Sequence, residues 1–192
     1  MNMDTAEKNL DPAESLQLIA SVIARTKENL REHSFVYLLW GWLIASASVV
    51  FFLLKECTSF RAFFLPFPLA ALIGIGVTIP FYRRLSRTVE TYLVFYLARL
   101  WLVLGIAFIL VVVVNVYEGT LPFRYTMLIA GIGTLVSGLV MRFRPLLLGG
   151  VLFLILMLST VFVPGKWYPL LQSFGFVLGY LVPGYLLKNT KS

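Results

Sequence analysis

The chain has 192 residues, of which 59% are hydrophobic and 13% are charged, and its formal net charge is +7. A soluble domain carries about a quarter charged residues, so this composition excludes an ordinary soluble fold and indicates a protein in lipid. The single cysteine, Cys57, excludes an internal disulfide and a cysteine-based metal cluster. The apolar stretches are long and continuous rather than alternating, so we predict an all-α integral membrane protein.

The polar N-terminus comes first, and residues 1–10 are predicted to be flexible. The run Asp11-Pro12-Ala13-Glu14 indicates a helix start, with Asp11 as N-cap and Pro12 as the first helical residue. We therefore predict an amphipathic helix over residues 11–34 on the cytoplasmic side of the membrane or in its interface. Its apolar residues share one broad arc: Leu16, Leu18, Ile19, Val22, Ile23 and Leu30.

Two interpretations of this amphipathic helix stay open. It can lie flat in the membrane interface, with Lys27 extended towards the headgroups. Alternatively, a subset of its residues approximates the a and d positions of a heptad repeat, which is typical of a docking or dimer helix. These residues are Leu16, Ile19, Ile23, Thr26 and Leu30.

Six apolar segments of transmembrane length follow and define a transmembrane domain over residues 35–187, ahead of a cytoplasmic tail at 188–192. We predict spans over residues 35–54, 63–82, 91–116, 125–141, 146–163 and 167–187, arranged as three hairpins. A basic loop, 83–87, is expected between the second and third spans. The motif Gly76-x-x-x-Pro80-x-Tyr82 recurs as Gly179-x-x-x-Pro183-x-Tyr185, which suggests an internal repeat.

The distribution of Lys and Arg predicts the orientation of these spans. Eleven basic residues fall on one side of the predicted membrane and four on the other, with Arg99 inside a span and left out. Because cytoplasmic loops carry the excess of positive charge, both termini are expected in the cytoplasm of a bacterial cell with the protein in its inner membrane. Basic residues beside apolar spans meet lipid headgroups, so we expect the lipid bilayer and no nucleic acid as partner.

Arg99 is the one charged residue deep in a predicted span. Charges inside a membrane are costly and are usually paired or functional. Tyr96 and Tyr92 precede it by three and seven residues, on roughly the same helix face, and form a tentative binding site with it. The alternative is a structural anchor, since Arg can reach the headgroups from this depth.

Small residues predict where helices pack closely. Gly175-x-x-x-Gly179 in the sixth span and Gly133-x-x-x-Ser137 in the fourth allow two helix backbones to approach in lipid. These contacts can lie within one bundle or between subunits of a homo-oligomer.

The residues that catalysis usually needs are missing from the spans. Both Asp residues precede the membrane domain, the only His is His33, and the three Glu residues of the membrane domain lie at span edges. This excludes an intramembrane aspartyl pair, a Ser–His couple and an H-E-x-x-H zinc site. We therefore expect no enzyme, no metal and no cofactor.

One stretch of the chain resembles a known family. Residues Glu14-Ser15-Leu16, Lys27 and then Phe35-x-Tyr37-Leu38-Leu39-Trp40-Gly41-Trp42 carry the resemblance. They resemble the start of uncharacterised six-span membrane proteins of Bacteroidetes-type bacteria. The resemblance covers residues 14–42, implies a bacterial inner-membrane protein and adds no catalytic residue.

These features predict a non-enzymatic membrane scaffold or regulatory subunit that presents residues 11–33 to a lipid surface or to a cytoplasmic or membrane protein. The alternative is a small oligomeric transporter or channel for a small solute or ion, built around Arg99 and the glycine-rich helices. A pore would be lined by the polar residues of the spans: Ser46, Ser48, Thr78, Thr134, Ser137, Ser159, Thr160, Gln172 and Ser173.

Overall fold

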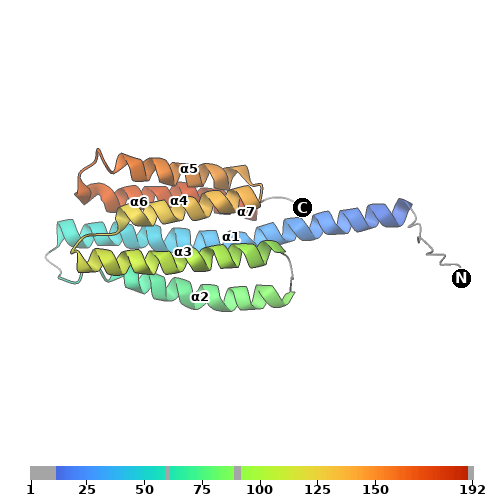
Figure 1. Ribbon diagram of the computed structural model, residues 1–192, viewed down its shortest axis with the longest axis horizontal. Coiled ribbons are helices and arrows are strands. Elements are labelled where there is room, and N and C mark those ends of the chain that lie inside the picture. The colour runs from blue at the N-terminus through green and yellow to red at the C-terminus, as the bar shows by residue number, and fades with distance from the viewer. Residues whose placement is uncertain (1–11, 59–60, 89–91, 190–192) are drawn as a thin grey trace, which may run out of the picture.

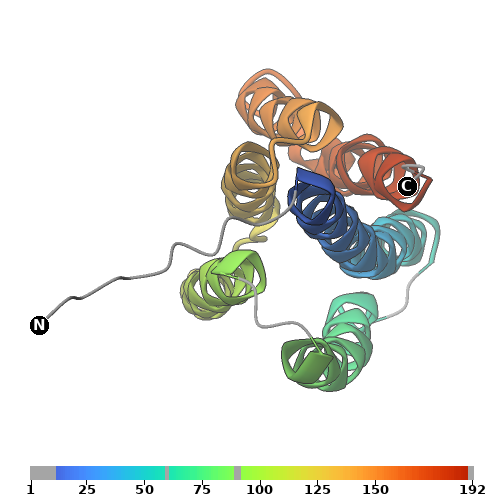
Figure 2. The same cartoon turned by 90° about the vertical axis from the view of Figure 1, so that its right-hand side faces the viewer.

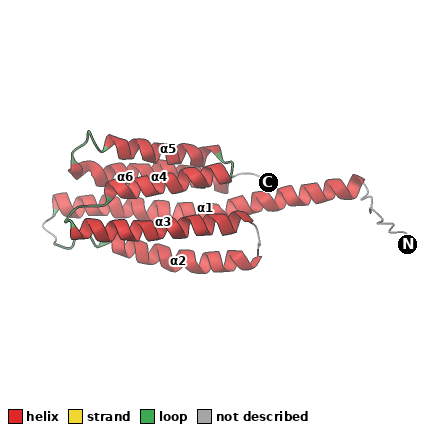
Figure 3. Cartoon of the chain, in the orientation of Figure 1, coloured by secondary structure: helices red, strands yellow, loops and turns green. Residues whose placement is uncertain are grey.

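The computed structural model describes residues 12–58, 61–88 and 92–189. Within these ranges the chain forms helices joined by short turns and contains no strand (Figure 3). The predicted flexible segment 1–10, the predicted N-cap Asp11 and the last three residues lie outside the described residues. The helices are α1 (Pro12–Cys57), α2 (Pro66–Thr88), α3 (Tyr92–Tyr117), α4 (Phe123–Val140) and α5 (Arg144–Ser159). The last passage is built from a 3-10 turn (Gly165–Trp167), α6 (Tyr168–Phe176), a π-helical turn η2 (Val177–Leu181) and α7 (Val182–Lys188).

Five helices of the described chain are long and apolar enough to cross a membrane, which indicates a multi-pass membrane protein. They are Ser34–Cys57, Pro66–Arg84, Phe95–Tyr117, Phe123–Val140 and Gly165–Lys188. The remaining predicted span, the fifth (146–163), corresponds to α5, an apolar helix of 16 residues. At 1.5 Å per residue α5 is about 24 Å long, which is shorter than the roughly 30 Å of a bilayer core.

Helix α1 is a single helix of 46 residues. It begins at Pro12, where the sequence predicts the first helical residue, and it continues without a break through the junction at residues 34 and 35. No proline follows Pro12 within α1, so nothing interrupts its hydrogen-bond ladder. The predicted amphipathic helix is therefore the N-terminal half of α1, and it extends beyond the end of the other helices (Figure 1).

The predicted basic loop at 83–87 is wrong. Helix α2 continues through these residues and ends at Thr88, and its start lies at Pro66 rather than at residue 63. The segment after Tyr82 contains no Gly or Pro, and basic side chains near a helix C-terminus interact favourably with the helix dipole. Pro80, expected near the end of the span, is consequently an interior residue of α2.

Helix α1 occupies the centre of the bundle. It packs against α2 on one side and against α6, η2 and α7 on the other, while α4 packs against α5 and α3 (Figure 2). The spans in α4 and in the last passage are 44% and 56% buried, whereas those in α2 and α3 are only 11% and 6% buried. The core is thus formed by α1, α4, α5 and the α6–α7 passage, with α2 and α3 attached at its edge.

The two copies of the predicted repeat motif occupy different settings. A Cβ built on Gly76 meets nothing within 4 Å, whereas one built on Gly179 lies 2.5 Å from the Phe153 ring. Pro80 sits inside a regular helix, whereas Pro183 is the second residue of α7, the helix that follows the π-helical turn. The shared residues therefore do not make equivalent packing contacts in the two passages.

Candidate functional site

Arg99 lies on the exposed surface of α3. Its guanidinium carbon is 5.0 Å from the centre of the Phe95 ring, one turn earlier on the same helix, which is a cation–π contact. Phe95 itself is exposed. The cation is therefore stacked on a surface ring and does not point into the bundle.

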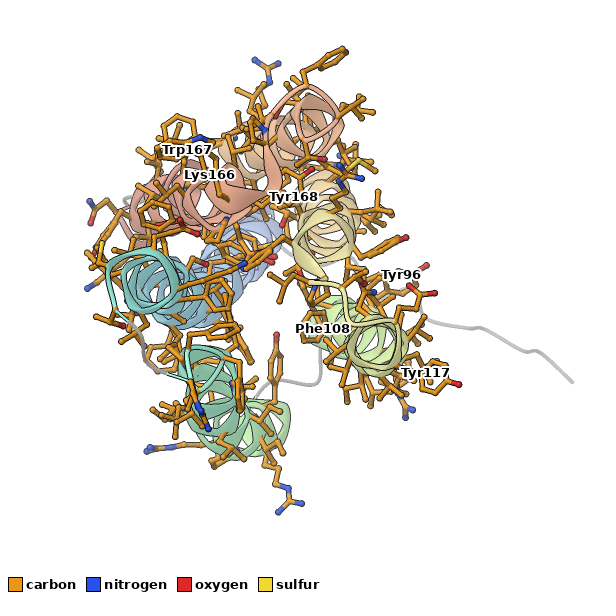
Figure 4. All side chains as sticks on the ribbon, turned by 90° about the vertical axis from the view of Figure 1, so that its left-hand side faces the viewer. Tyr96, Phe108, Tyr117, Lys166, Trp167 and Tyr168 are labelled. Carbon is orange, nitrogen blue, oxygen red and sulfur yellow. The ribbon has the colours of Figure 1, made fainter. Side chains whose placement is uncertain are left out.

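Tyr96, the predicted partner of Arg99 whose side chain the structure describes, does not enclose it. Tyr96 is 61% exposed and points away from the bundle, as does Tyr117 at the other end of α3 (Figure 4). Tyr92 is the first residue of α3, and its side chain lies outside the described part of the structure. Of the three tentative binding residues, the structure thus places two on the outer surface of α3 without a pocket between them.

The predicted packing residues all lie at contacts within this chain. A Cβ at Gly175 would lie 2.9 Å from the Phe153 ring of α5, the same ring that Gly179 meets. Gly133 receives the Trp101 ring of α3, 2.8 Å from its built Cβ, and Ser137 is fully buried. These small residues make room for aromatic rings of neighbouring helices.

The most enclosed group of functional side chains is a cluster of aromatic rings at the centre of the bundle. Tyr37 of α1 meets Tyr180 of η2 at 5.5 Å between ring centres and Trp101 of α3 at 6.4 Å, both edge to face. Tyr180 also meets Phe153 at 5.5 Å and Phe176 at 4.8 Å. Such edge-to-face pairs are the preferred geometry for aromatic rings, so the cluster joins four of the passages rigidly.

Two hydroxyl groups in this cluster have no hydrogen-bond partner among the described residues. They are the Tyr37 hydroxyl and the hydroxyl of Ser137 on α4, which lie next to each other. The neighbouring Thr134 hydroxyl is satisfied instead by its own helix, donating to the Ala130 carbonyl at 2.6 Å. A buried hydroxyl without a well-oriented partner costs free energy, so this pair is a polar position of the core that packing alone does not compensate.

The π-helical turn positions Tyr180 within the cluster. Pro183 has no N–H, so the carbonyl of Gly179, four residues earlier, cannot receive the usual helical hydrogen bond. A helix relieves this loss by widening locally, and the wide turn covers Val177–Leu181. Gly179 also permits close contact with Gly149 of α5, whose built Cβ would lie 2.6 Å from the Gly179 carbonyl oxygen.

A second polar group joins α1 to α6 further along the bundle. Gln172 donates from Nε2 to the Ser48 hydroxyl at 3.2 Å, and Ser173 donates to the Ala45 carbonyl at 3.1 Å. All three polar side chains are buried, and the Gln172 Oε1 has no partner among the described residues. These bonds hold two helices together where lipid supplies no hydrophobic drive.

Side chains of α4 and α6 cover the C-terminal end of α5. Arg124 donates to the Thr160 carbonyl at 3.2 Å and contacts the Tyr168 hydroxyl, which itself donates to the same carbonyl at 2.8 Å. The Arg124 guanidinium also lies 5.0 Å from the centre of the Tyr168 ring. The carbonyl oxygen of Thr160 thus accepts two hydrogen bonds where α5 ends.

Most polar span residues therefore serve contacts between or within helices. Thr78 accepts a hydrogen bond from the Trp40 indole at 3.0 Å, joining α1 to α2. Asn115 is buried and bonds to the Val111 carbonyl and to Thr120, which closes the end of α3. Ser46 is exposed on α1 and donates to the Trp42 carbonyl of its own helix at 2.7 Å.

The central cluster was not predicted from the sequence. Its rings come from α1, α3, α5, α6 and η2, and nothing in their local spacing brings them together. A local signal existed for η2 alone, since Gly179-x-x-x-Pro183 removes a hydrogen bond at a known place. The polar residues Gln172 and Ser173 were identified only as pore-lining material.

The chemistry available in these groups is limited to hydroxyl, amide and guanidinium groups. In the described part of the chain, no three His, Cys, Asp or Glu side chains gather closely enough to hold a metal ion. Hydroxyl and amide groups can bind a small polar molecule or join helices, but the cluster lacks the acid–base pair of a hydrolytic site.

Comparison of the chain with protein-family models, with curated proteins and with solved structures finds no match. The resemblance of residues 14–42 to a six-span bacterial family stays a prediction.

Proposed function

We propose that this chain is a six-span protein of the bacterial inner membrane that acts as a non-enzymatic scaffold or regulatory subunit. Its presenting element is the N-terminal half of α1, residues 12–33. The observation that carries the proposal is the continuity of α1: one helix is both the centre of the bundle and an arm beyond its end. Whatever binds the arm is thereby coupled mechanically to the core.

Six crossings are consistent with the short helix α5. A helix that ends inside the hydrocarbon core leaves carbonyl oxygens without partners, which is costly in lipid. Arg124 and Tyr168 supply those partners at the Thr160 carbonyl. An even number of crossings also gathers Arg83, Arg142, Arg144 and Lys188 at one end of the bundle, together with the arm. By the positive-inside rule that end is cytoplasmic.

The geometry of α1 favours a docking helix over an interfacial one. The arm has 22 residues and a length of about 33 Å, and it continues the axis of a span instead of turning into the membrane plane (Figure 1). Its heptad-like apolar positions give it a seam for one further helix. That helix belongs to a second copy of this chain or to another protein.

The test replaces three seam residues together, Leu16, Ile19 and Ile23, by Ser. The matched control replaces Gln17, Arg25 and Glu28 on the opposite face by Ser, which disturbs helix propensity to a similar degree. In mild detergent, we expect the seam variant to lose mass in light-scattering chromatography and the control to keep it.

Protease treatment of inverted vesicles distinguishes a docking helix from an interfacial helix. An arm that becomes cleavable in the seam variant without a change of mass would identify an interfacial helix. If neither the mass nor the cleavage changes, the arm has no presenting role and the proposal fails.

A further inference from the structure

A groove runs along the outside of the bundle between α5 and the η2–α7 segment. Its volume is about 350 Å³. Its walls are the apolar side chains of Leu148, Leu152, Leu178, Val182 and Leu186, and the only charged side chain in its lining is Arg144. An elongated apolar groove with one cation at its end matches an amphiphile better than a solute or an ion.

The groove exists because two glycines bring α5 and η2 together. The Cβ that a side chain at 149 would carry lies 2.6 Å from the Gly179 carbonyl oxygen, so the backbones touch there. Gly149 has no side chain to fill the groove above this contact. Leu148, Leu152 and Leu178 form the sides of the groove. Leu148 is 66% exposed along this edge. The floor of the groove is therefore backbone at Gly149, and no side chain at this position can rotate to fill it.

The end of the groove at Arg144 is strongly basic. Arg144 begins α5, Arg142 precedes it in a turn with φ of 51°, and Lys188 ends α7 at the same end of the bundle. The one acidic residue of the described segment 92–189, Glu118, follows the end of α3 at the opposite end of the bundle.

The start of α5 adds to this positive field. No side chain caps its N-terminus. Pro145 in the first turn has no N–H, so the uncapped start presents mainly its positive dipole end to an anion. Arg144 and this helix start together offer charge and hydrogen bonds to one phosphate group.

We propose that this groove binds an anionic phospholipid, with its phosphate at Arg144 and the start of α5 and one acyl chain along the groove over Gly149. From Arg144 to Leu152 the groove extends about 12 Å along α5, which accommodates the part of an acyl chain nearest the headgroup. Basic pockets between membrane helices bind anionic headgroups in this way. The inference rests on the membrane placement proposed above but not on the α1 arm.

The experiment is native mass spectrometry of the purified full-length chain in mild detergent with added phosphatidylglycerol, phosphatidylcholine or inorganic phosphate. We expect one phosphatidylglycerol adduct that persists when the detergent is stripped, with phosphatidylcholine bound about tenfold more weakly. Arg144→Gln should lower phosphatidylglycerol binding about tenfold, and Arg83→Gln, another exposed arginine at the same end, should leave it unchanged.

The acyl part is tested by filling the groove. Leu148→Trp should reduce phosphatidylglycerol binding severalfold, whereas Leu158→Trp, on the same helix and 61% exposed but outside the groove, should not. Thermal unfolding of each variant confirms that it folds. Equal binding of the two lipids, or full displacement by phosphate alone, would overturn the proposal. These outcomes do not affect the test of the α1 arm, because that test measures the mass of the assembly in detergent and not lipid binding.

Discussion

Substitution of Gly149 by Ala tests the packing of the bundle most directly. The added Cβ would lie 2.6 Å from the Gly179 carbonyl oxygen and 3.0 Å from its Cα, although ordinary contact begins near 3.4 Å. The obstructing atoms belong to the backbone of η2, so they cannot rotate away. Overpacking of this kind costs about 1–3 kcal/mol, and the better helix propensity of Ala returns up to about 1 kcal/mol. With the full propensity gain subtracted, we expect a net loss of up to about 2 kcal/mol in the free energy of unfolding.

Two other glycines provide matched controls for this substitution. A Cβ at Gly76 on α2 or at Gly105 on α3 meets nothing within 4 Å. Substitution by Ala there gains helix propensity without a clash, so it should raise stability by up to about 1 kcal/mol. Gly179→Ala should also lower stability, because its added Cβ would lie 2.5 Å from the fully buried Phe153 ring and 3.2 Å from the Gly149 carbonyl oxygen.

The measurement is reversible unfolding in mixed micelles titrated with dodecyl sulfate and followed by circular dichroism. If Gly149→Ala is as stable as Gly76→Ala, the contact between α5 and η2 is not as close as the structure has it. If Gly76→Ala or Gly105→Ala loses 1 kcal/mol or more, another helix covers that face, and the bundle is an incomplete part of an oligomer.

Three further predictions concern orientation, the polar seam and Arg99. Cys57 is exposed at the end of α1 opposite the arm, so a membrane-impermeant maleimide should label it in spheroplasts and not in inside-out vesicles; the reverse pattern would invert the topology. Gln172→Leu removes an unpaired buried oxygen together with one hydrogen bond, so the unfolding free energy should change by less than about 0.5 kcal/mol; a larger loss would reveal a partner for that oxygen. Arg99→Lys should change neither thermal stability nor anion flux into liposomes, because Arg99 is exposed and stacks on Phe95. Flux in the wild type that disappears in this variant would favour a channel.

The helices themselves could be predicted from hydropathy, whereas several of their ends could not. Residues 83–88 are basic but helix-compatible, so charge alone does not end α2 there. Helix α5 was predicted to reach residue 163 but ends at Ser159. The Ser159 and Thr160 hydroxyls donate to carbonyls three residues back, at 2.7 and 2.6 Å, and this bonding competes with continuation of the helix.

The candidate site shows a different limit of sequence reasoning. Arg99 was selected because a charge inside a span costs free energy. That cost is small when the side chain lies on the surface of the bundle. The sequence does not show which face of a helix is the outer one. The cluster of Tyr37, Trp101 and Tyr180 depends on the contacts of α1 with η2 and of α3 with α4. Such contacts between passages far apart in the chain are not encoded in local periodicity.

The use of glycine explains why four passages form the core and two remain at its edge. In lipid, helices associate through close packing and hydrogen bonds, since apolar side chains gain nothing by leaving the hydrocarbon. Between α4 and α5, a Cβ at Gly138 or at Gly150 would lie 2.5 Å from a backbone nitrogen of the facing helix. At the edge, Gly74 of α2 receives the Trp40 ring and Gly133 of α4 receives Leu104 and Trp101 of α3, and the helical glycines with open space lie on α2 and α3. Backbone contact thus joins α5 to α4 and to η2, whereas α2 and α3 are attached through side chains such as Trp40, Phe51 and Trp101 and leave most of their apolar surface to lipid or to another helix.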